Sequence, residues 1–218
     1  TFGTGEAAVA AVSGVSFRIA PGEFVGIMGA SGAGKSTLLG MIGAMSAPSS
    51  GRLIVDEIDV YALPLERQAD FRREYLGFVF QGFHLVPYLT ALENVMLPLV
   101  VTGLGRKQKQ AKAGEALAEV GLADKGRRLP GELSGGEKER VAVARAIVND
   151  PPVLLADEPT GNLDSTTSAE IMAMFRKLNA AGMTIIMVTH SPECAGNARR
   201  LITVADGRLT GDRVLIPG

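Results

Sequence analysis

Short apolar runs alternate along the chain with amphipathic stretches. The runs Phe24–Met28, Val153–Ala156 and Ile185–Val188 are almost wholly apolar, which predicts strands buried on both faces of a mainly parallel sheet. With other runs bounded by turn residues, the expected strands are Val15–Ile19, Phe24–Met28, Gly51–Val55, Gly77–Phe80, Val153–Ala156, Thr184–Val188, Arg200–Val204 and Arg208–Thr210. Strands that alternate with helical stretches indicate an α/β architecture.

Helical periodicity is clearest in two stretches between these strands. In Thr167–Ala181, apolar residues recur at i, i+3, i+4 and i+7, and Lys107–Val120 repeats the pattern with lysines on its solvated face. Residues from about 82 to 148 contain no run that favours a strand. This part of the chain therefore reads as a helical insertion between two sheet-forming segments.

Composition and charge narrow the class of protein. Apolar residues make up 46% of the chain and charged residues 21%, as in an ordinary soluble globular domain. The formal net charge of −1 provides no basic surface for nucleic acid. The single cysteine, Cys194, excludes a disulfide framework and a cysteine metal site. The longest apolar stretches, such as Val95–Val101, are interrupted by Pro98 and fall far short of a membrane span.

The segment Gly29–Ser36 matches the phosphate-loop pattern G-x-x-x-x-G-K-[ST], with an apolar strand before it and a helical segment after it. Glycines let successive backbone N–H groups point at one centre, and the helix N-terminus adds positive potential there. We expect Lys35 to reach the β- and γ-phosphates of a nucleotide and the Ser36 hydroxyl to bind Mg²⁺. The expected nucleotide contacts in this region are Gly29, Ala30, Ser31, Gly32, Ala33, Gly34, Lys35, Ser36 and Thr37.

Two carboxylates follow a second apolar strand. Val153–Ala156 leads directly into Asp157 and Glu158, and a charge at the end of a buried strand is costly unless it has a partner or a task. With a phosphate loop in the same chain, Asp157 is expected to hold the Mg²⁺ shell, as the corresponding aspartate does in P-loop enzymes. Glu158 can then orient and deprotonate an attacking water. The alternative is that Glu158 is surface charge beyond the strand end.

A glycine-containing motif, Leu133–Glu137, lies between these two sites. Ser134 and Glu137 have the spacing of a capping box, which predicts a helix start, and a capped N-terminus with two glycines presents free N–H groups to an anion. With this motif, the chain resembles an ABC ATPase subunit. The signature of that family usually has glutamine as its fifth residue, where this chain has Glu137. In that family the signature contacts the γ-phosphate held by a partner subunit, which implies this role for Ser134, Gly135 and Gly136.

Further positions match the family in chain order. Gln81 resembles the glutamine that touches Mg²⁺ or the attacking water, and His190 resembles the histidine that contacts the γ-phosphate. Gly161–Asp164 resembles the loop that crosses the dimer interface, and Asp164 is counted among the nucleotide contacts. Phe2 stands where such proteins usually carry a tyrosine that stacks on adenine. The resemblance implies catalytic roles for Glu158, His190, Gln81 and Lys35, and a metal site made of Ser36, Gln81 and Asp157.

The resemblance spans essentially the whole chain and implies its fold. We expect a P-loop NTPase core with a mainly parallel sheet, an antiparallel β edge and an inserted ABC α-helical subdomain. One domain over residues 1–218 would then consist of a core at about 1–81 and 149–218 and a helical subdomain at about 82–148. Motifs such as Phe78–Pro87 look most like the ATPases of lipoprotein-release systems, macrolide exporters and the FtsE type.

The implied function is hydrolysis of ATP, with Mg²⁺, by a homodimer that forms on ATP binding. The dimer would drive a separate FtsX-like membrane permease in lipoprotein, macrolide or peptide export, from the cytoplasmic face of the inner membrane. The exposed part of the apolar run Phe83–Tyr88 is a candidate groove for a cytoplasmic helix of that partner. An FtsE-like regulatory ATPase of a cell-envelope signalling complex without transport is the alternative.

Two other classes fit the sequence less well. A soluble ABC ATPase that acts on DNA or ribosomes needs a coiled-coil insertion or two ATPase domains in tandem. The short insertion, the single set of motifs and the lack of a basic patch argue against it. A small-molecule P-loop kinase would have a lid and no Leu-Ser-Gly-Gly motif.

Overall fold

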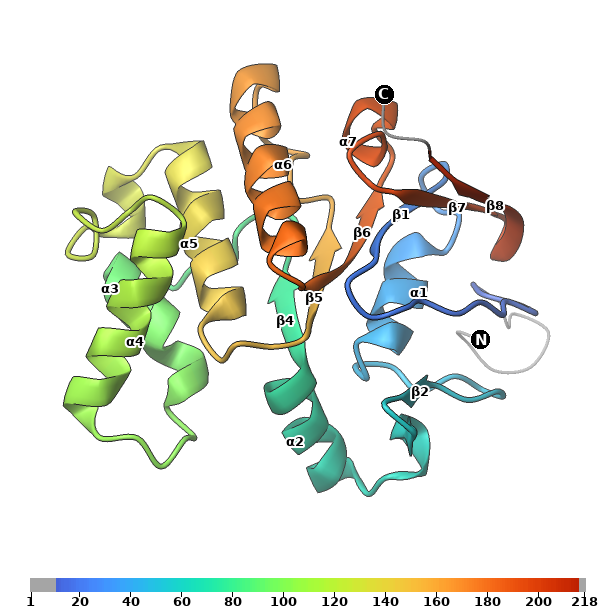
Figure 1. Cartoon of the computed structure of the whole chain (residues 1–218), viewed down its shortest axis with the longest axis horizontal. Coiled ribbons are helices and arrows are strands. Elements are labelled where there is room, and N and C mark those ends of the chain that lie inside the picture. Colours follow the sequence, from blue (N-terminus) through green and yellow to red (C-terminus); the bar gives the residue numbers. More distant parts are fainter. Residues whose placement is uncertain (1–10, 216–218) are drawn as a thin grey trace.

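The computed structural model describes residues 11–215. Its main sheet has six strands in the order β4-β5-β6-β1-β7-β8 (Figure 1). Neighbouring strands are parallel except β7 and β8, which run antiparallel at one edge. The strands are β1 (Phe24–Met28), β4 (Leu76–Val79), β5 (Val153–Asp157), β6 (Thr184–Thr189), β7 (Arg200–Ala205) and β8 (Arg208–Val214). The expected mainly parallel sheet with an antiparallel edge is confirmed.

Helices and short 3-10 turns connect the strands. The helices are α1 (Lys35–Ile42), α2 (Leu65–Tyr75), α3 (Ala91–Met96), α4 (Arg106–Glu119), α5 (Gly135–Ile147), α6 (Ser165–Ala180) and α7 (Pro192–Ala195). The 3-10 turns are η2 (Val60–Ala62), η3 (Leu97–Leu99) and η4 (Pro130–Glu132). Between β4 and β5 the chain forms helices, 3-10 turns and loops only, and Figure 1 shows α3, α4 and α5 gathered at one side of the molecule.

Both faces of the sheet are buried because successive residues of its central strands enter different hydrophobic clusters. In β5, Leu154 and Ala156 belong to one cluster and Leu155 to the other. The first cluster also takes in apolar residues of α5 and α6, and the second takes in residues of α1 and α2. This two-sided burial explains why the central strands are continuous apolar runs rather than alternating ones.

The structure differs from the sequence expectations in two places. The segment Val15–Ile19 packs alternate apolar side chains against the core but joins neither sheet in the described part of the chain. In the main sheet, β5, β6, β1 and β7 already have neighbours on both edges. The expected strand Gly51–Val55 is reduced to β2 (Ile54–Val55), which pairs with β3 (Ile58–Asp59) in a small antiparallel hairpin.

Among the helices of residues 11–215, none combines the length and the apolar character that crossing a membrane requires.

Candidate functional site

The chain turns sharply between β1 and α1. Gly32 and Gly34 have φ values of 80° and 93°, a left-handed conformation that glycine adopts at little cost. A Cβ atom on Gly29 would lie 2.1 Å from the carbonyl oxygen of Val204, and one on Gly34 would lie 2.1 Å from that of Ala11. Close backbone packing therefore requires glycine at both ends of the loop. The strand, loop and helix expected around this motif are all present.

Lys35 and Ser36 begin α1 beside the end of β5. Lys35 is buried, and its Nζ donates a hydrogen bond to the carbonyl oxygen of Ala30 at 3.0 Å. The ammonium group is thus folded over the loop. The Ser36 hydroxyl donates to Oδ1 of Asp157 at 3.1 Å. Burial raises the pKa of Asp157, and the hydrogen bond from Ser36 opposes that shift. Two oxygen atoms suited to a hard cation therefore lie together at the loop.

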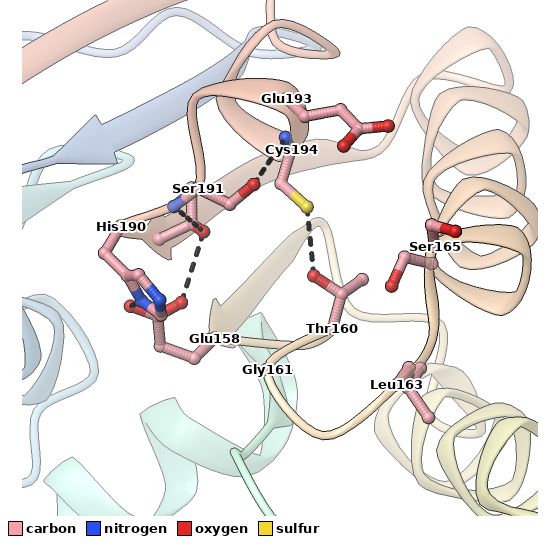
Figure 2. A pocket seen from close by; sticks show the side chains of 11 residues that line it. Glu158, Thr160, Gly161, Leu163, Ser165, His190, Ser191, Glu193 and Cys194 are labelled. Carbon is pink, nitrogen blue, oxygen red and sulfur yellow. Dashed lines mark hydrogen bonds and ion pairs between the residues drawn. The ribbon is translucent and has the colours of Figure 1, made fainter.

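Glu158 follows β5 with a φ of 49°, a left-handed conformation that is costly for a residue with a Cβ. Its Oε1 lies 2.8 Å from Nδ1 of His190, and its Oε2 accepts a hydrogen bond from the Thr189 hydroxyl at 3.2 Å. Figure 2 shows the His190 ring directed at this carboxylate. The Glu158 side chain is 12% exposed and that of His190 is 64% exposed. The carboxylate is thus held in place while the ring remains open to solvent.

Gly161 brings Gln81 close to Glu158. A Cβ on Gly161 would lie 3.1 Å from Nε2 of Gln81, and the Gly161 amide donates to the carbonyl oxygen of Glu158 at 3.0 Å. A cavity of about 240 Å³ adjoins this group, lined in part by Glu158 and His190 (Figure 2). In its wall, Sγ of Cys194 lies 3.0 Å from Oγ1 of Thr160. The glutamine, the histidine and the glutamate expected to act together are therefore neighbours.

Ser134 caps α5 as the sequence predicts. Its hydroxyl accepts a hydrogen bond from the Glu137 amide at 3.2 Å, and the Glu137 carboxylate accepts one from the Ser134 amide at 2.8 Å. This backbone hydrogen bond is the main reason that the pKa of Glu137 is lowered. Ser134 and Gly135 are exposed, so the start of α5 is open to a ligand from outside the chain.

The beginnings of α5 and α6 lie against each other. A Cβ on Gly136 would lie 2.4 Å from Cγ2 of Thr167, and one on Gly135 would lie 3.3 Å from Cδ2 of Leu163. Asp164 caps α6, because its carboxylate accepts hydrogen bonds from the amide and hydroxyl of Thr167 at 3.0 and 2.6 Å. These hydrogen bonds lower the pKa of Asp164. The expected signature motif and interface loop thus form one exposed unit.

The predicted residues fall into two separate groups. One group surrounds the start of α1 and the ends of β5 and β6, and comprises the loop residues Gly29–Thr37 with Gln81, Asp157, Glu158 and His190. The other comprises Ser134, Gly135, Gly136 and Asp164. Figure 1 shows α5 and α1 on opposite sides of β4 and β5, and no hydrogen bond among the described residues joins Ser134 to the loop Gly29–Thr37. Phe2 lies outside the described residues.

Sequence reasoning missed Thr189, which is fully buried and hydrogen-bonds Glu158. Its hydroxyl also accepts a hydrogen bond from the Ser191 amide at 3.0 Å. The available signal was a polar residue that ends an apolar strand directly before His190. The other histidine, His84, lies in the turn after Gln81, where its ring contacts that of Phe80 with centroids 5.3 Å apart.

In a comparison with protein families, residues 12–161 match the family described as ABC transporter. Similar curated proteins point to the same family. The macrolide export ATP-binding/permease protein MacB of Chromobacterium violaceum is 46% identical over 211 residues, which cover 97% of this chain and 33% of MacB. An uncharacterized ABC transporter ATP-binding protein of Thermotoga maritima is 45% identical over 207 residues, which cover 95% of this chain and 88% of that protein. The chain thus spans about a third of MacB and most of the shorter relative.

Solved structures with the same fold include the dimeric cassette MJ0796. Its post-hydrolysis state bound to ADP and Pi superposes with a TM-score of 0.90 at 40% identity, covering 99% of this chain and 95% of that one. A second dimeric MJ0796 structure, titled as a bacterial ABC transporter cassette, gives a TM-score of 0.89 at 41% identity, with coverage of 98% and 94%. The ABC ATPase cassette fold expected from the sequence is confirmed.

Proposed function

The chain belongs to the ABC transporter family, and from that premise we propose that it binds and hydrolyses ATP as a dimer that drives a membrane permease. The observation that carries the proposal is a pair of contacts beside a glycine loop in which Gly29 and Gly34 leave no room for a Cβ. Ser36 bonds Asp157, and the next residue, Glu158, contacts His190. The ADP and Pi in one MJ0796 structure, at 40% identity, support the same chemistry.

The loop is suited to the phosphates of ATP. Its glycines expose backbone N–H groups, the start of α1 adds positive potential, and Lys35 is already folded over the loop. Within residues 11–215 there is no cluster of three or more His, Cys, Asp or Glu side chains that could hold a metal. The Ser36 and Asp157 oxygens instead form a two-oxygen set, which fits Mg²⁺ because that ion is usually bound by one or two protein groups together with phosphates. Gln81 completes the proposed metal site.

Glu158 is the proposed general base. Phosphoryl transfer requires positioning and charge stabilisation more than covalent chemistry from the protein. Contacts with His190 and Thr189 hold both carboxylate oxygens of Glu158, which fixes the direction in which it can accept a proton from water. Gln81, which lies beside Gly161, would orient that water, and His190 would contact the γ-phosphate.

Two chains are needed for a complete site in this proposal. In Figure 1, α5, which Ser134 caps, lies on the other side of β4 and β5 from α1, and the start of α5 is exposed. A second chain facing the first would place this unit against the nucleotide. The dimeric MJ0796 structures support this arrangement. ATP would bridge the chains, and loss of the γ-phosphate would release them.

We further propose an FtsX-like permease as the partner, with the subunit lying peripherally on the cytoplasmic face of the inner membrane. The fused permease named in MacB supports a permease partner. The helical subdomain at about 82–148 would carry the contact, through the exposed part of Phe83–Tyr88, where Tyr88 is 78% exposed. Export of a macrolide, lipoprotein or peptide follows from the MacB likeness. An FtsE-like regulatory role without transport is the second candidate.

Glu158→Gln tests the chemistry. This variant keeps the volume of the side chain and removes its ability to take a proton, so ATP binding should persist while turnover falls at least a hundredfold and an ATP-bound dimer accumulates. Near wild-type turnover by Glu158→Gln would remove Glu158 from this role.

Mixing two inactive chains tests the composite site. Ser134→Arg blocks the signature side and Lys35→Ala blocks the loop side, so each homodimer has two damaged sites. A mixed dimer contains one intact site and should regain activity. No recovery on mixing, with heterodimer formation verified, would contradict the two-chain site.

A further inference from the structure

The turn that follows Gln81 is strained and is held by one arginine. Gly82, Phe83 and His84 have successive φ values of 93°, 65° and 47°, a conformation that residues with a Cβ rarely adopt. Arg145 of α5 reaches this turn: its Nη1 donates to the carbonyl oxygen of His84 at 2.6 Å, and its Nη2 donates to that of Phe83 at 2.8 Å. No other side chain of the described residues hydrogen-bonds these two carbonyls.

The rest of the loop has a different anchor. Asn94 of α3 is fully buried, and its amide accepts a hydrogen bond from the Val86 amide and donates to the carbonyl oxygens of Val86, Leu89 and Thr90 at 3.1, 2.9 and 3.0 Å. These contacts begin two residues beyond the strained turn. Besides the backbone bonds from the Phe83 amide to the Phe80 carbonyl oxygen at 3.3 Å and from the His84 amide to the Gly82 carbonyl oxygen at 2.7 Å, the residues directly after Gln81 are held by Arg145 rather than by Asn94.

Arg145 also connects the two groups of site residues. It lies on the helix that Ser134 caps, and the turn it holds leads directly to Gln81, whose amide lies beside Gly161. The two bonds use the forked geometry of a guanidinium, in which two nitrogens meet two acceptors at once.

We propose that Arg145 is a positioning residue for Gln81. Its hydrogen bonds tie the left-handed turn to α5 and thereby fix the Gln81 side chain in the catalytic group. The inference rests on the proposed function and adds to it a residue that touches neither the nucleotide loop nor Glu158. Loss of Arg145 leaves the nucleotide loop intact and lets the turn relax, so it lowers turnover without weakening ATP binding.

Arg145→Met is the test, because methionine keeps most of the apolar stem and removes both donors. We expect kcat for ATP to fall at least tenfold, the Kd for a fluorescent ATP analogue to stay within twofold of the wild-type value, and amide hydrogen exchange to speed up at residues 82–86. A kcat within twofold of wild type would overturn the proposal. So would a loss of ATP binding that matches the loss of kcat, because it would indicate general damage.

Arg140→Met is the matched control. Arg140 also lies on α5 and makes two bonds, to the carbonyl oxygen of Val120 at 3.1 Å and to the Glu170 carboxylate at 2.8 Å, but neither reaches the turn. The Arg140→Met variant should keep kcat within twofold of the wild-type value and leave amide hydrogen exchange at residues 82–86 unchanged. An equal loss of kcat in Arg140→Met would attribute the effect to α5 as a whole and overturn the proposal.

Arg145→Lys covers the case in which Arg145→Met does not fold. Lysine keeps the charge and loses the fork, so kcat should fall between threefold and tenfold with an unchanged Kd. Full wild-type kcat and exchange in Arg145→Lys would overturn the proposal. The wild-type chain separates the two levels. If it neither binds nor hydrolyses ATP, the proposed function fails, whereas an active wild type beside a fully active Arg145→Met rejects only the role of Arg145.

Discussion

Glu139 on α5 is buried with a carboxylate oxygen that has no hydrogen-bond partner among the described residues, and replacing it with glutamine should stabilise the protein in a pH-dependent way. The side chain is 1% exposed. Burial raises the pKa of Glu139 from 4.5 to about 8, and the charge of Arg145 only partly opposes the shift. The folded protein therefore holds a proton here that the unfolded chain releases.

The sign and size follow from proton linkage. Between pH 4.5 and 8 the folded state binds more protons at this site than the unfolded state, so stability falls as pH rises through this window and levels off above it. At about 1.4 kcal/mol per pKa unit, the change between pH 5 and 9 is roughly 4 kcal/mol as an upper bound. That is a large part of the 5–15 kcal/mol, roughly, by which a domain is stable.

Urea unfolding of wild type and Glu139→Gln at pH 5, 7 and 9 measures this effect. Glutamine has the same shape and no charge, so its own packing cost is the same at each pH, and the difference between the two proteins isolates the proton. We expect the advantage of Glu139→Gln to grow from pH 5 to pH 9. Glu115→Gln, an exposed carboxylate on α4, controls for loss of one negative charge. A difference between wild type and Glu139→Gln that stays constant across this range would refute the reasoning.

Two further predictions concern buried polar residues. Thr189→Val keeps the shape of the side chain and removes the hydrogen bonds to Glu158 and from Ser191. Steady-state kinetics should show kcat reduced about threefold to tenfold, the equivalent of roughly 1 kcal/mol, while the Kd for ATP is unchanged. An unchanged kcat would mean that Thr189 does not support Glu158. Asn94→Ala removes four hydrogen bonds to the loop and leaves the Val86 amide and the Leu89 carbonyl without their partner. It should lower the free energy of unfolding by about 2–4 kcal/mol, measured by urea titration against Thr102→Ala, which loses one bond. Equal losses in the two variants would contradict this.

Most of the sheet could be predicted because its physical signal is local. A strand buried on both faces, such as the run Val153–Ala156 in β5, is apolar at every position, and that pattern is visible without the fold. The capping box at Ser134 is equally local, since both of its bonds join residues three positions apart. The segment Val15–Ile19 misled because its alternating pattern records burial against the core, and an alternating pattern does not reveal whether a sheet edge is free.

The parts of the site that the sequence did not predict depend on distant contacts. Arg145 hydrogen-bonds the Phe83 and His84 carbonyls across about sixty residues of sequence. Because every residue has a backbone carbonyl, the pattern of side chains does not show which carbonyls accept such bonds. Thr189 lies 31 residues from Glu158. Glu139 reads as a solvated charge in a polar stretch of sequence, yet its position on α5 buries it completely. In each case the residue type is ordinary and the surroundings give it its role.

The bond between Cys194 and Thr160 has a practical consequence for spectroscopy. Cys194 is the one cysteine of the chain and is 6% exposed, so a bulky maleimide dye should not reach its sulfur in the folded state. A cysteine introduced at exposed Tyr88 could therefore be labelled selectively without first removing the native thiol. Cys194 also lines the cavity beside Glu158 and His190, so the rate at which a small thiol reagent modifies Cys194 would report how readily a small molecule enters that cavity.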